Sequence, residues 1–235
     1  MFRTPTTTAE ENRVFCQDLH SQGSVTDMPD DERLKSLMDS GFAGRDRDFS
    51  PYVKVLGALG VKPGARILDF GCSWGYGSWQ LQRSGFEVDA FEISESRCRF
   101  AREKLGVNAS DRIGSIPEGK YDVFFSAHVL EHVPSVSSAI DLARAKVVRG
   151  GLFVAFTANG SEGNRRRDPV GWARLWGLNH PNFLDDVSYR HVFSDVLLAS
   201  GPYDHELLAD AWHRSGVRSL PLDGYELLAV TRMEG

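Results

Sequence analysis

The residues best suited to chemistry on a small ligand lie in a glycine-rich loop. The loop reads Asp69-Phe70-Gly71-Cys72-Ser73-Trp74-Gly75, and its glycines allow a sharp turn that presents main-chain N–H groups to a ligand. A second acid, Glu92, follows Gly71 by 21 residues, where a carboxylate can accept hydrogen bonds from both hydroxyls of a ribose. The loop and the acid together predict a nucleoside ligand. Taken singly, the glycines need only shape a turn, and Glu92 need only cap the helix expected near Ser94.

The spacing of the glycines separates this loop from a nicotinamide dinucleotide fingerprint. That fingerprint, GxGxxG, needs glycines at its first, third and sixth positions, but those positions hold Gly71, Ser73 and Tyr76. The pattern that fits places Asp69, Gly71, Ser73 and Gly75 at alternate positions. An NAD-dependent oxidoreductase is compatible with the fold alone, and the loop spacing disfavours it.

Apolar segments of strand length alternate with helical segments on both sides of this loop. We expect strands at 65–70, 86–92, 121–127, 151–158 and 225–232, and helices at 51–60, 74–83, 95–105, 135–148 and 203–215. Parallel strands need long crossover connections, so this alternation indicates a sheet covered by helices on both faces. The predicted fold class is α/β, a doubly wound and mostly parallel sheet with an antiparallel C-terminal edge strand.

The polarity of the chain changes near residue 48. Residues 1–48 are rich in Thr, Asp, Glu and Ser and predict a polar arm or lid with one short helix at 31–38. Residues 49–235 form a single predicted domain, interrupted at 159–194 by an aromatic-rich insertion that fits neither a strand nor a crossover. Long irregular segments in compact domains are commonly functional, so we expect this insertion to lie over the strand ends.

The composition excludes several classes of protein. The 235 residues include 27 basic and 32 acidic side chains, a net charge of -5, which disfavours a surface for duplex nucleic acid. Neither an apolar run of about 20 residues nor a signal-peptide pattern is present, so we expect a cytoplasmic protein without a membrane span. Cys16, Cys72 and Cys98 are odd in number and widely spaced, which predicts neither disulfides nor a metal site.

Four segments, taken in order, resemble the class I S-adenosylmethionine-dependent methyltransferases. ILDFGCSWGYG is similar to their first motif, FEVDAFEIS to their second strand and its acid, YDVFFSAHVLEHVPS to their fourth strand, and RGGLFVAFTAN to their fifth. The resemblance spans about residues 52 to 159. It implies S-adenosylmethionine as cofactor, S-adenosylhomocysteine as product, and the seven-stranded Rossmann-like fold of that family.

The resemblance also assigns the cofactor contacts: the ribose would meet Glu92 and the adenine would pack on Ile93. The residues placed at the methionyl part are Asp69, Gly71, Cys72, Ser73, Gly75, Ser126, Ala127 and His128. Ser73 replaces the usual middle glycine, and we expect its φ to be negative and its hydroxyl to reach the cofactor carboxylate. No clear acid-terminated third strand precedes Tyr121, which leaves Asp111 and Ser115 as candidates for the adenine amino contact.

Methyl transfer to a hydroxyl needs an aligned acceptor and removal of the acceptor's proton. His128, just after the fourth predicted strand, is the first candidate for a general base; the alternative is that it only orients its loop. His180 and His191 in the insertion are the other catalytic candidates. Glu131 and His132 lie in the segment LEHV, which resembles a motif common in the family, and we expect them to hold the loop after the fourth predicted strand in place.

Acceptor contacts are expected from the insertion. The candidates are Arg165, Trp172, Trp176, Asn179 and Tyr189. Exposed Trp faces beside polar groups suit sugar rings or flat aromatics, but the four-residue spacing of the two Trp residues also suits one helix face packed on the core. The basic run at 165–167 could hold a phosphate or carboxylate of the acceptor, or be a solvated loop.

The predicted function is methyl transfer from S-adenosylmethionine to a small or medium-sized acceptor, most plausibly a hydroxyl of a sugar, a glycoconjugate or another secondary metabolite. A non-catalytic or regulatory module that binds a protein partner is the alternative, and acceptor-dependent release of S-adenosylhomocysteine separates the two. Nucleic-acid methylation is disfavoured by the charge, and because SAHVLEHV stands where amino-methylating DNA enzymes have Asn/Asp-Pro-Pro-aromatic. The oligomeric state is left open.

Overall fold

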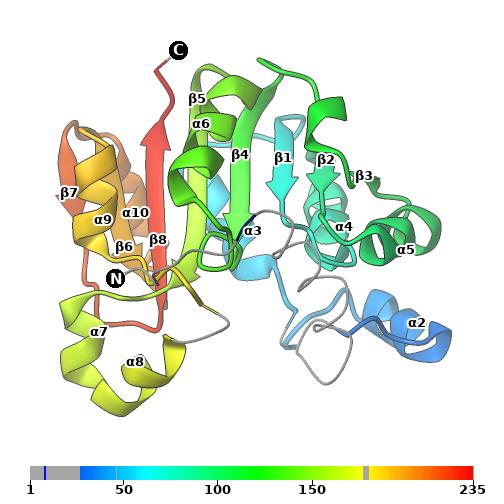
Figure 1. The fold of residues 1–235 in the computed structure, drawn as a ribbon, viewed down its shortest axis with the longest axis horizontal. Coiled ribbons are helices and arrows are strands. Elements are labelled where there is room, and N and C mark those ends of the chain that lie inside the picture. The colour runs from blue at the N-terminus through cyan, green and yellow to red at the C-terminus, as the bar shows by residue number, and fades with distance from the viewer. Residues whose placement is uncertain (1–7, 9–26, 46, 177–179, 235) are drawn as a thin grey trace.

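The computed structural model describes residues 8, 27–45, 47–176 and 180–234. Within these residues one sheet of eight strands runs through the molecule (Figure 1). The strands are β1 (Arg66–Phe70), β2 (Glu87–Phe91), β3 (Asn108–Ser110), β4 (Tyr121–Ala127), β5 (Val147–Ala158), β6 (Val196–Ser200), β7 (Val217–Ser219) and β8 (Glu226–Arg232). Their order across the sheet is β3-β2-β1-β4-β5-β8-β6-β7.

The strand pairing confirms the doubly wound α/β fold class. Strands β1 to β5 pair in parallel, whereas β8 pairs antiparallel with both β5 and β6. The antiparallel C-terminal strand therefore lies inside the sheet, and β7 forms the edge that was expected of β8. The sequence prediction also missed β6, because the buried run VLLAS lacks the alternation that marks a strand with one exposed face.

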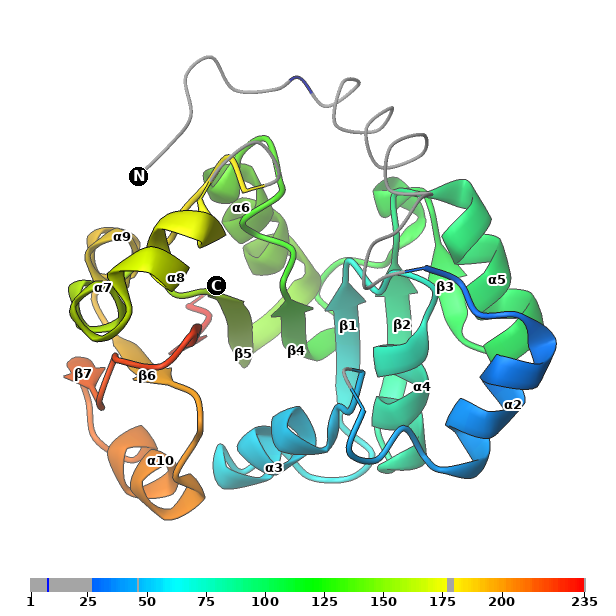
Figure 2. The ribbon, with the colours of Figure 1, turned by 90° about the horizontal axis from the view of Figure 1, so that it is seen from below.

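Helices cover both faces of the sheet, as Figure 2 shows. They are α2 (Asp31–Asp39), α3 (Ser50–Ala58), α4 (Tyr76–Arg83), α5 (Glu95–Leu105), α6 (Val136–Lys146), α7 (Glu162–Arg167), α8 (Pro169–Leu175), α9 (Asp186–Val192) and α10 (His205–Trp212). Leu56, Leu81 and Leu208 pack α3, α4 and α10 on one face, and Ile140 and Tyr189 pack α6 and α9 on the other. Among the residues that the structure describes, no helix combines the length and the apolar character needed to cross a membrane.

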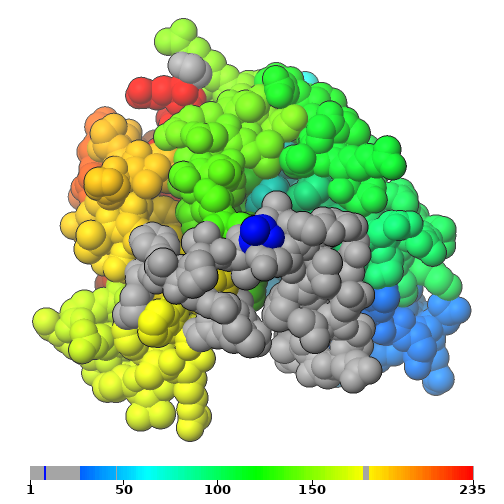
Figure 3. Space-filling view, in the orientation of Figure 1, coloured from blue at the N-terminus to red at the C-terminus, as the bar shows by residue number. Residues whose placement is uncertain are grey.

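The elements around the carboxyl ends of the parallel strands position the candidate site. The loops after β1, β2 and β4 meet at this edge, and the helices α7 and α8 lie beyond it (Figure 1). Figure 3 shows the segment with α7 and α8 at one corner of the molecule and α2 at another. The described part of the predicted arm packs on the domain, because Phe42 lies 6.0 Å from Trp74 and 5.6 Å from Trp79 between ring centroids.

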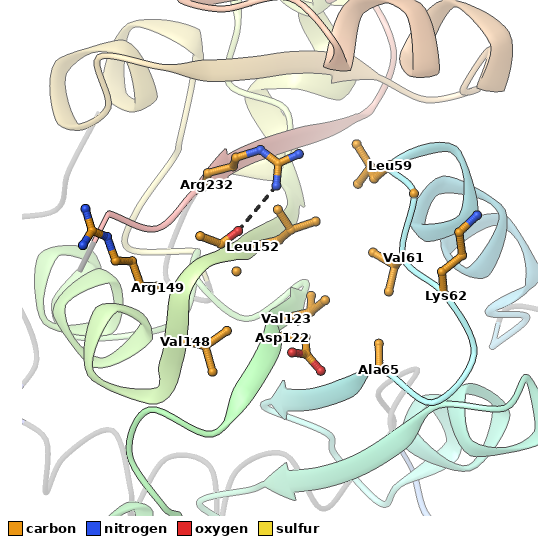
Figure 4. A pocket seen from close by; sticks show the side chains of 13 residues that line it. Leu59, Val61, Lys62, Ala65, Asp122, Val123, Val148, Arg149, Leu152 and Arg232 are labelled. Carbon is orange, nitrogen blue, oxygen red and sulfur yellow. Dashed lines mark hydrogen bonds between the residues drawn. The ribbon is translucent and has the colours of Figure 1, made fainter.

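A cavity of about 340 Å³ opens at the opposite edge of the sheet (Figure 4). It lies between the start of β4, the start of β5 and the end of β8, with Val61, Asp122, Arg149 and Arg232 in its wall. None of the predicted cofactor, catalytic or acceptor residues lines this cavity. The candidate residues lie instead at the loops that follow the carboxyl ends of the strands.

Candidate functional site

The loop after β1 is shaped by a buried acid and by a glycine that no other residue type can replace. Asp69 is 3% exposed and accepts a hydrogen bond from Ser78 Oγ at 2.6 Å. Burial raises the pKa of Asp69 to about 7, against the lowering effect of that hydrogen bond. Gly71 has φ +87°, and a Cβ there would lie 2.4 Å from Cγ2 of Val129. Position 71 therefore requires glycine for both its backbone conformation and its packing.

Ser73 contradicts the expectation of a negative φ. Its φ is +52°, in the left-handed region, which costs an ordinary residue about 1–2 kcal/mol. The turn is held because the Ser73 N–H donates to Glu92 Oε2 at 2.9 Å. The Ser73 hydroxyl is buried and has no hydrogen-bond partner in the described structure.

Glu92 holds two segments of the site. Its Oε1 accepts from Ser94 N at 2.8 Å and its Oε2 accepts from Ser73 N, so it joins the start of α5 to the glycine loop. Burial raises the pKa of Glu92, although both N–H donors favour its charged form. Each carboxylate oxygen can accept a further hydrogen bond. The helix-start contact foreseen as an alternative is thus present, and it leaves one acceptor position on each oxygen for a ligand hydroxyl.

The third strand is present, which corrects the expectation that no acid-terminated strand precedes Tyr121. Strand β3 has only three residues, Asn-Ala-Ser, and Asp111 follows it directly. It was missed because so short and polar a segment carries no apolar pattern. Ser110 and Ser115 lie 2.7 Å apart between their hydroxyl oxygens. Both candidates for the adenine contact, Asp111 and Ser115, therefore lie beside the end of β3.

The end of β4 turns sharply at His128. Ser126 is fully buried and its hydroxyl has no partner within the described residues. His128 has φ +56°, and its N–H donates to the carbonyl oxygen of Phe156 at 2.8 Å. Its imidazole lies between two carboxylates, with Nδ1 at 3.2 Å from Glu131 Oε1 and Nε2 at 2.7 Å from Glu226 Oε2.

Glu226 gathers side chains from four segments into what we call the Glu226 cluster: Tyr52, His128, Tyr203 and Glu226. Tyr52 Oη donates to Glu226 Oε2 and Tyr203 Oη donates to Glu226 Oε1, both at 2.6 Å. Sequence reasoning identified only His128 among the four. A usable signal was the acid that begins the last, otherwise apolar strand, because an antiparallel strand starts at the edge where parallel strands end.

The two carboxylates determine the charge of His128. Burial lowers the pKa of His128, but its hydrogen bonds to Glu131 and Glu226 outweigh this and raise the pKa to about 10. Burial likewise raises the pKa of Glu131, and the His128 contact reverses this to give a pKa of about 2. At neutral pH His128 is therefore an imidazolium, which donates protons and cannot accept one.

The acceptor candidates of the insertion are spread along its helices. Arg165 pairs with Glu162 at 3.3 Å and lies over the Trp172 ring at 5.5 Å. Trp172 packs on Phe183 with ring centroids 5.0 Å apart, and Trp176 is 40% exposed. Trp172 therefore packs on the buried Phe183, whereas Trp176 lies just past the end of α8 and is exposed, so the two Trp residues do not share one buried face.

The remaining predicted residues that the structure describes form no hydrogen bond with the side chains of the Glu226 cluster. Tyr189 is buried in the core between α9 and the sheet, and His191 is exposed at the end of α9. His180 packs against His132 with ring centroids 4.7 Å apart. One ligand atom each from Glu131, His132 and His180 lie within 4.8 Å of one another, a spacing that could hold a metal ion. Asn179 lies outside the described residues.

The strand order, the glycine loop after β1 and the buried acid after β2 define a Rossmann-like domain of the S-adenosylmethionine-dependent methyltransferase type. A family profile described as a methyltransferase domain matches residues 43–196. The chain belongs to this methyltransferase family, which confirms the resemblance read from the sequence.

Two comparisons show how far individual likenesses extend. The ubiquinone biosynthesis O-methyltransferase of Paramagnetospirillum magneticum is 34% identical over 103 residues, which are 41% of each chain. The chain spans less than half the length of the curated relatives it matches. Geranyl diphosphate C-methyltransferase from Streptomyces coelicolor A3(2) superposes with a TM-score of 0.61 at 12% identity, covering 97% of this chain and 100% of that one.

A second solved structure gives the same result for the fold. A Thermotoga maritima S-adenosylmethionine-dependent methyltransferase, described as a possible histamine N-methyltransferase, has a TM-score of 0.56 at 13% identity and covers 87% of this chain and 97% of its own. At these identities the likeness concerns the architecture alone.

Proposed function

We propose that this protein transfers a methyl group from S-adenosylmethionine to a hydroxyl oxygen of a small molecule. The observation that carries the proposal is the glycine loop, in which the Glu92 carboxylate holds Ser73, Ser78 holds Asp69, and Gly71 packs against Val129. Membership of the methyltransferase family supports the reaction, and the O-methyltransferase name of the curated relatives supports oxygen as the acceptor atom.

The polar atoms of the loop fit the cofactor. Two buried hydroxyls, of Ser73 and Ser126, have no hydrogen-bond partner in the described structure and are suited to the polar groups of the methionyl part. Glu92 can accept the ribose hydroxyls on its remaining lone pairs, and half-buried Ile93 offers an apolar surface to the adenine. When bound, the cofactor supplies a methyl group activated by a sulfonium.

The chain's own part in the reaction is to orient the acceptor and to remove its proton. His128 is the proposed base, and Glu131 and Glu226 fix its ring by hydrogen bonds to both nitrogens. Because these bonds hold His128 protonated at neutral pH, it has to lose its proton before it can accept one. Methyl transfer that uses His128 should therefore accelerate as the pH rises.

The acceptor is proposed to bind beside the Glu226 cluster and beneath the insertion. The partly exposed rings of Trp172 and Trp176 support a stacking contact with a sugar ring, a glycoconjugate or another secondary metabolite. Arg165 and Arg166 give little support to a phosphate-bearing acceptor, because Glu162 pairs with both. The net charge of -5 supports a small molecule over nucleic acid.

The test is a calorimetric titration with S-adenosylhomocysteine, with NAD as the comparison ligand, on the wild type and on Glu92→Ala and Gly71→Val. We expect micromolar binding of S-adenosylhomocysteine alone, lost in both variants. An acceptor screen with a labelled methyl donor then follows. Absence of S-adenosylhomocysteine binding in the folded wild type would overturn the proposal.

A further inference from the structure

The cavity of about 340 Å³ lies at the edge of the sheet where β4 and β5 begin, and the proposed function does not use it (Figure 4). The residues proposed to bind the cofactor follow the ends of β1, β2 and β4 instead. The volume is within the range of small-molecule sites. The cavity is therefore large enough for a second, separate ligand.

Aliphatic side chains form the floor of this cavity. Leu152 pairs in register with Val123 on one side and with Arg232 on the other, so the three side chains form one row across β4, β5 and β8. Val123 and Leu152 are buried, whereas Val61 and Val148 in the wall are half-buried and offer apolar surface to a ligand. A hydrocarbon chain placed on this floor would gain from leaving water.

Three exposed cations surround the floor: Lys62, Arg149 and Arg232. In Figure 4 the Arg232 guanidinium lies above Leu152, with Arg149 to one side and Lys62 to the other. Among the residues that the structure describes, no carboxylate forms an ion pair with any of the three cations.

The acid in the wall does not balance these cations, because it has a partner of its own. Asp122 Oδ2 accepts from the Arg66 N–H at 2.8 Å and lies 3.7 Å from Arg66 Nε, and Arg66 is outside the wall. The cavity is therefore positive, although the whole chain has a net charge of -5. Charge of one sign around a concave surface attracts ligands of the opposite sign.

Arg232 is held at the cavity by contacts that leave most of its hydrogen-bond donors for a ligand. Its Nη1 donates to the carbonyl oxygen of Gly150 at 3.4 Å, and its guanidinium lies 4.8 Å from the centroid of the Trp212 ring. A guanidinium has five N–H donors in a fixed fork, which can bind a carboxylate through two parallel hydrogen bonds. The chemistry of Arg232 therefore suits a carboxylate.

We propose that this cavity is a second ligand site, which binds a small organic carboxylate with a short apolar chain. The carboxylate pairs with Arg232, and Lys62 and Arg149 add attraction from the rim. The chain lies along Val61 and Leu152. This inference is independent of the proposed function, because no residue of this site is among the proposed cofactor contacts or in the Glu226 cluster.

The test compares three probes: hexanoate, hexanamide and inorganic phosphate. Hexanamide has the shape of hexanoate without its charge, and phosphate has charge without a chain. Binding is followed at fixed ionic strength by two-dimensional NMR, through the amide signals of Val61, Val123 and Gly150, which line the cavity. Each hexanoate titration is repeated in the presence of S-adenosylhomocysteine.

The variants are Arg232→Gln, Arg232→Lys and Arg149→Gln, with Arg144→Gln as the matched control. Arg144 is exposed and pairs with Asp141 at 2.7 Å, and it does not line the cavity. Arg144→Gln therefore changes the net charge of the protein as Arg232→Gln does, without changing the cavity. Thermal unfolding shows whether each variant is folded.

We expect hexanoate to shift the cavity signals with a dissociation constant of about 1 mM or below. It should bind at least about tenfold more tightly than hexanamide and phosphate, whether or not S-adenosylhomocysteine is present. Arg232→Gln should weaken hexanoate binding at least about fivefold, and Arg232→Lys, which keeps the charge, should weaken it less. Arg149→Gln should weaken it about twofold to threefold, and Arg144→Gln should leave it unchanged.

Four results would overturn the inference. The first is the absence of a saturable shift of the cavity signals by hexanoate. The second is equal binding of hexanoate and hexanamide, or of hexanoate and phosphate. The third is a hexanoate affinity that Arg232→Gln leaves unchanged or that Arg144→Gln weakens as much. The fourth is loss of hexanoate binding when S-adenosylhomocysteine is added, which would place hexanoate at the cofactor site.

Discussion

Replacing Glu226 with glutamine should change the pH dependence of methyl transfer in a direction that ordinary loss of function does not. In the wild type two carboxylates hold the pKa of His128 at about 10, so about 0.3% of the imidazole is neutral at pH 7.5. Half of the His128 side chain is exposed, so water screens part of each interaction. Losing one carboxylate should lower the pKa by about 2 units, which raises the neutral fraction to about 20% at the same pH.

If His128 is the base, kcat/KM rises with pH in the wild type and levels off near pH 10. In Glu226→Gln the same rise should level off about 2 units earlier, and the variant should be faster than the wild type near neutral pH. The assay is the release of S-adenosylhomocysteine from pH 6 to 10.5, with a side-chain NMR titration of His128 as an activity-independent measure of its pKa. An unshifted profile together with a shifted His128 pKa would refute the role of His128 as base.

Three further outcomes follow from the loops. Gly71→Ala should destabilise the fold by about 2 kcal/mol or more and abolish S-adenosylhomocysteine binding, because its Cβ would meet Val129 at 2.4 Å. The matched control is Gly106→Ala, because Gly106 has φ +67° and a Cβ there would have nothing within 4 Å. Its free energy of unfolding should fall by only about 1 kcal/mol. Ser73→Gly should raise the free energy of unfolding by about 0.5–1 kcal/mol, since relief of a left-handed serine exceeds the added chain entropy, and no gain in urea unfolding would show that the serine is unstrained. The raised pKa of His128 contributes stability that is complete below about pH 6.5 and is lost as the pH rises through about 10; wild type should therefore lose on the order of 1–2 kcal/mol between pH 7 and 10, and an equal loss in His128→Asn would contradict this.

The residues proposed to bind the cofactor could be placed near one another from the sequence, because they follow directly from strand ends. Asp69 and Glu92 close two neighbouring parallel strands, and the carboxyl ends of such strands meet at one edge of the sheet. Local sequence alone therefore places both acids and the glycines between them. The sign of φ at Ser73 could not be predicted this way, because it depends on the hydrogen bond from Ser73 N to a carboxylate 19 residues away.

The Glu226 cluster could not be predicted from the sequence, because its members come together only in the folded chain. Tyr52 and Glu226 are 174 residues apart, and His128 and Glu226 are 98 apart. The contact also depends on β8 lying inside the sheet, beside β5, which no local pattern indicates. The Trp and Arg residues of the insertion stand out in the composition of that segment. The members of the Glu226 cluster are brought together only by the order of the strands in the sheet.

The two strained turns of the site are linked to each other. Three described residues other than glycine have positive φ, and two of them, Ser73 and His128, follow the adjacent strands β1 and β4. Val129, next to His128, fills the space that any side chain at Gly71 would need, so the two turns pack directly together. Each turn is held by carboxylates, Ser73 through its N–H and His128 through its ring. Backbone strain of this kind persists only where surrounding contacts hold it and is concentrated at functional sites. The same acids that suit ligand binding therefore also hold the loops in the conformation that presents them.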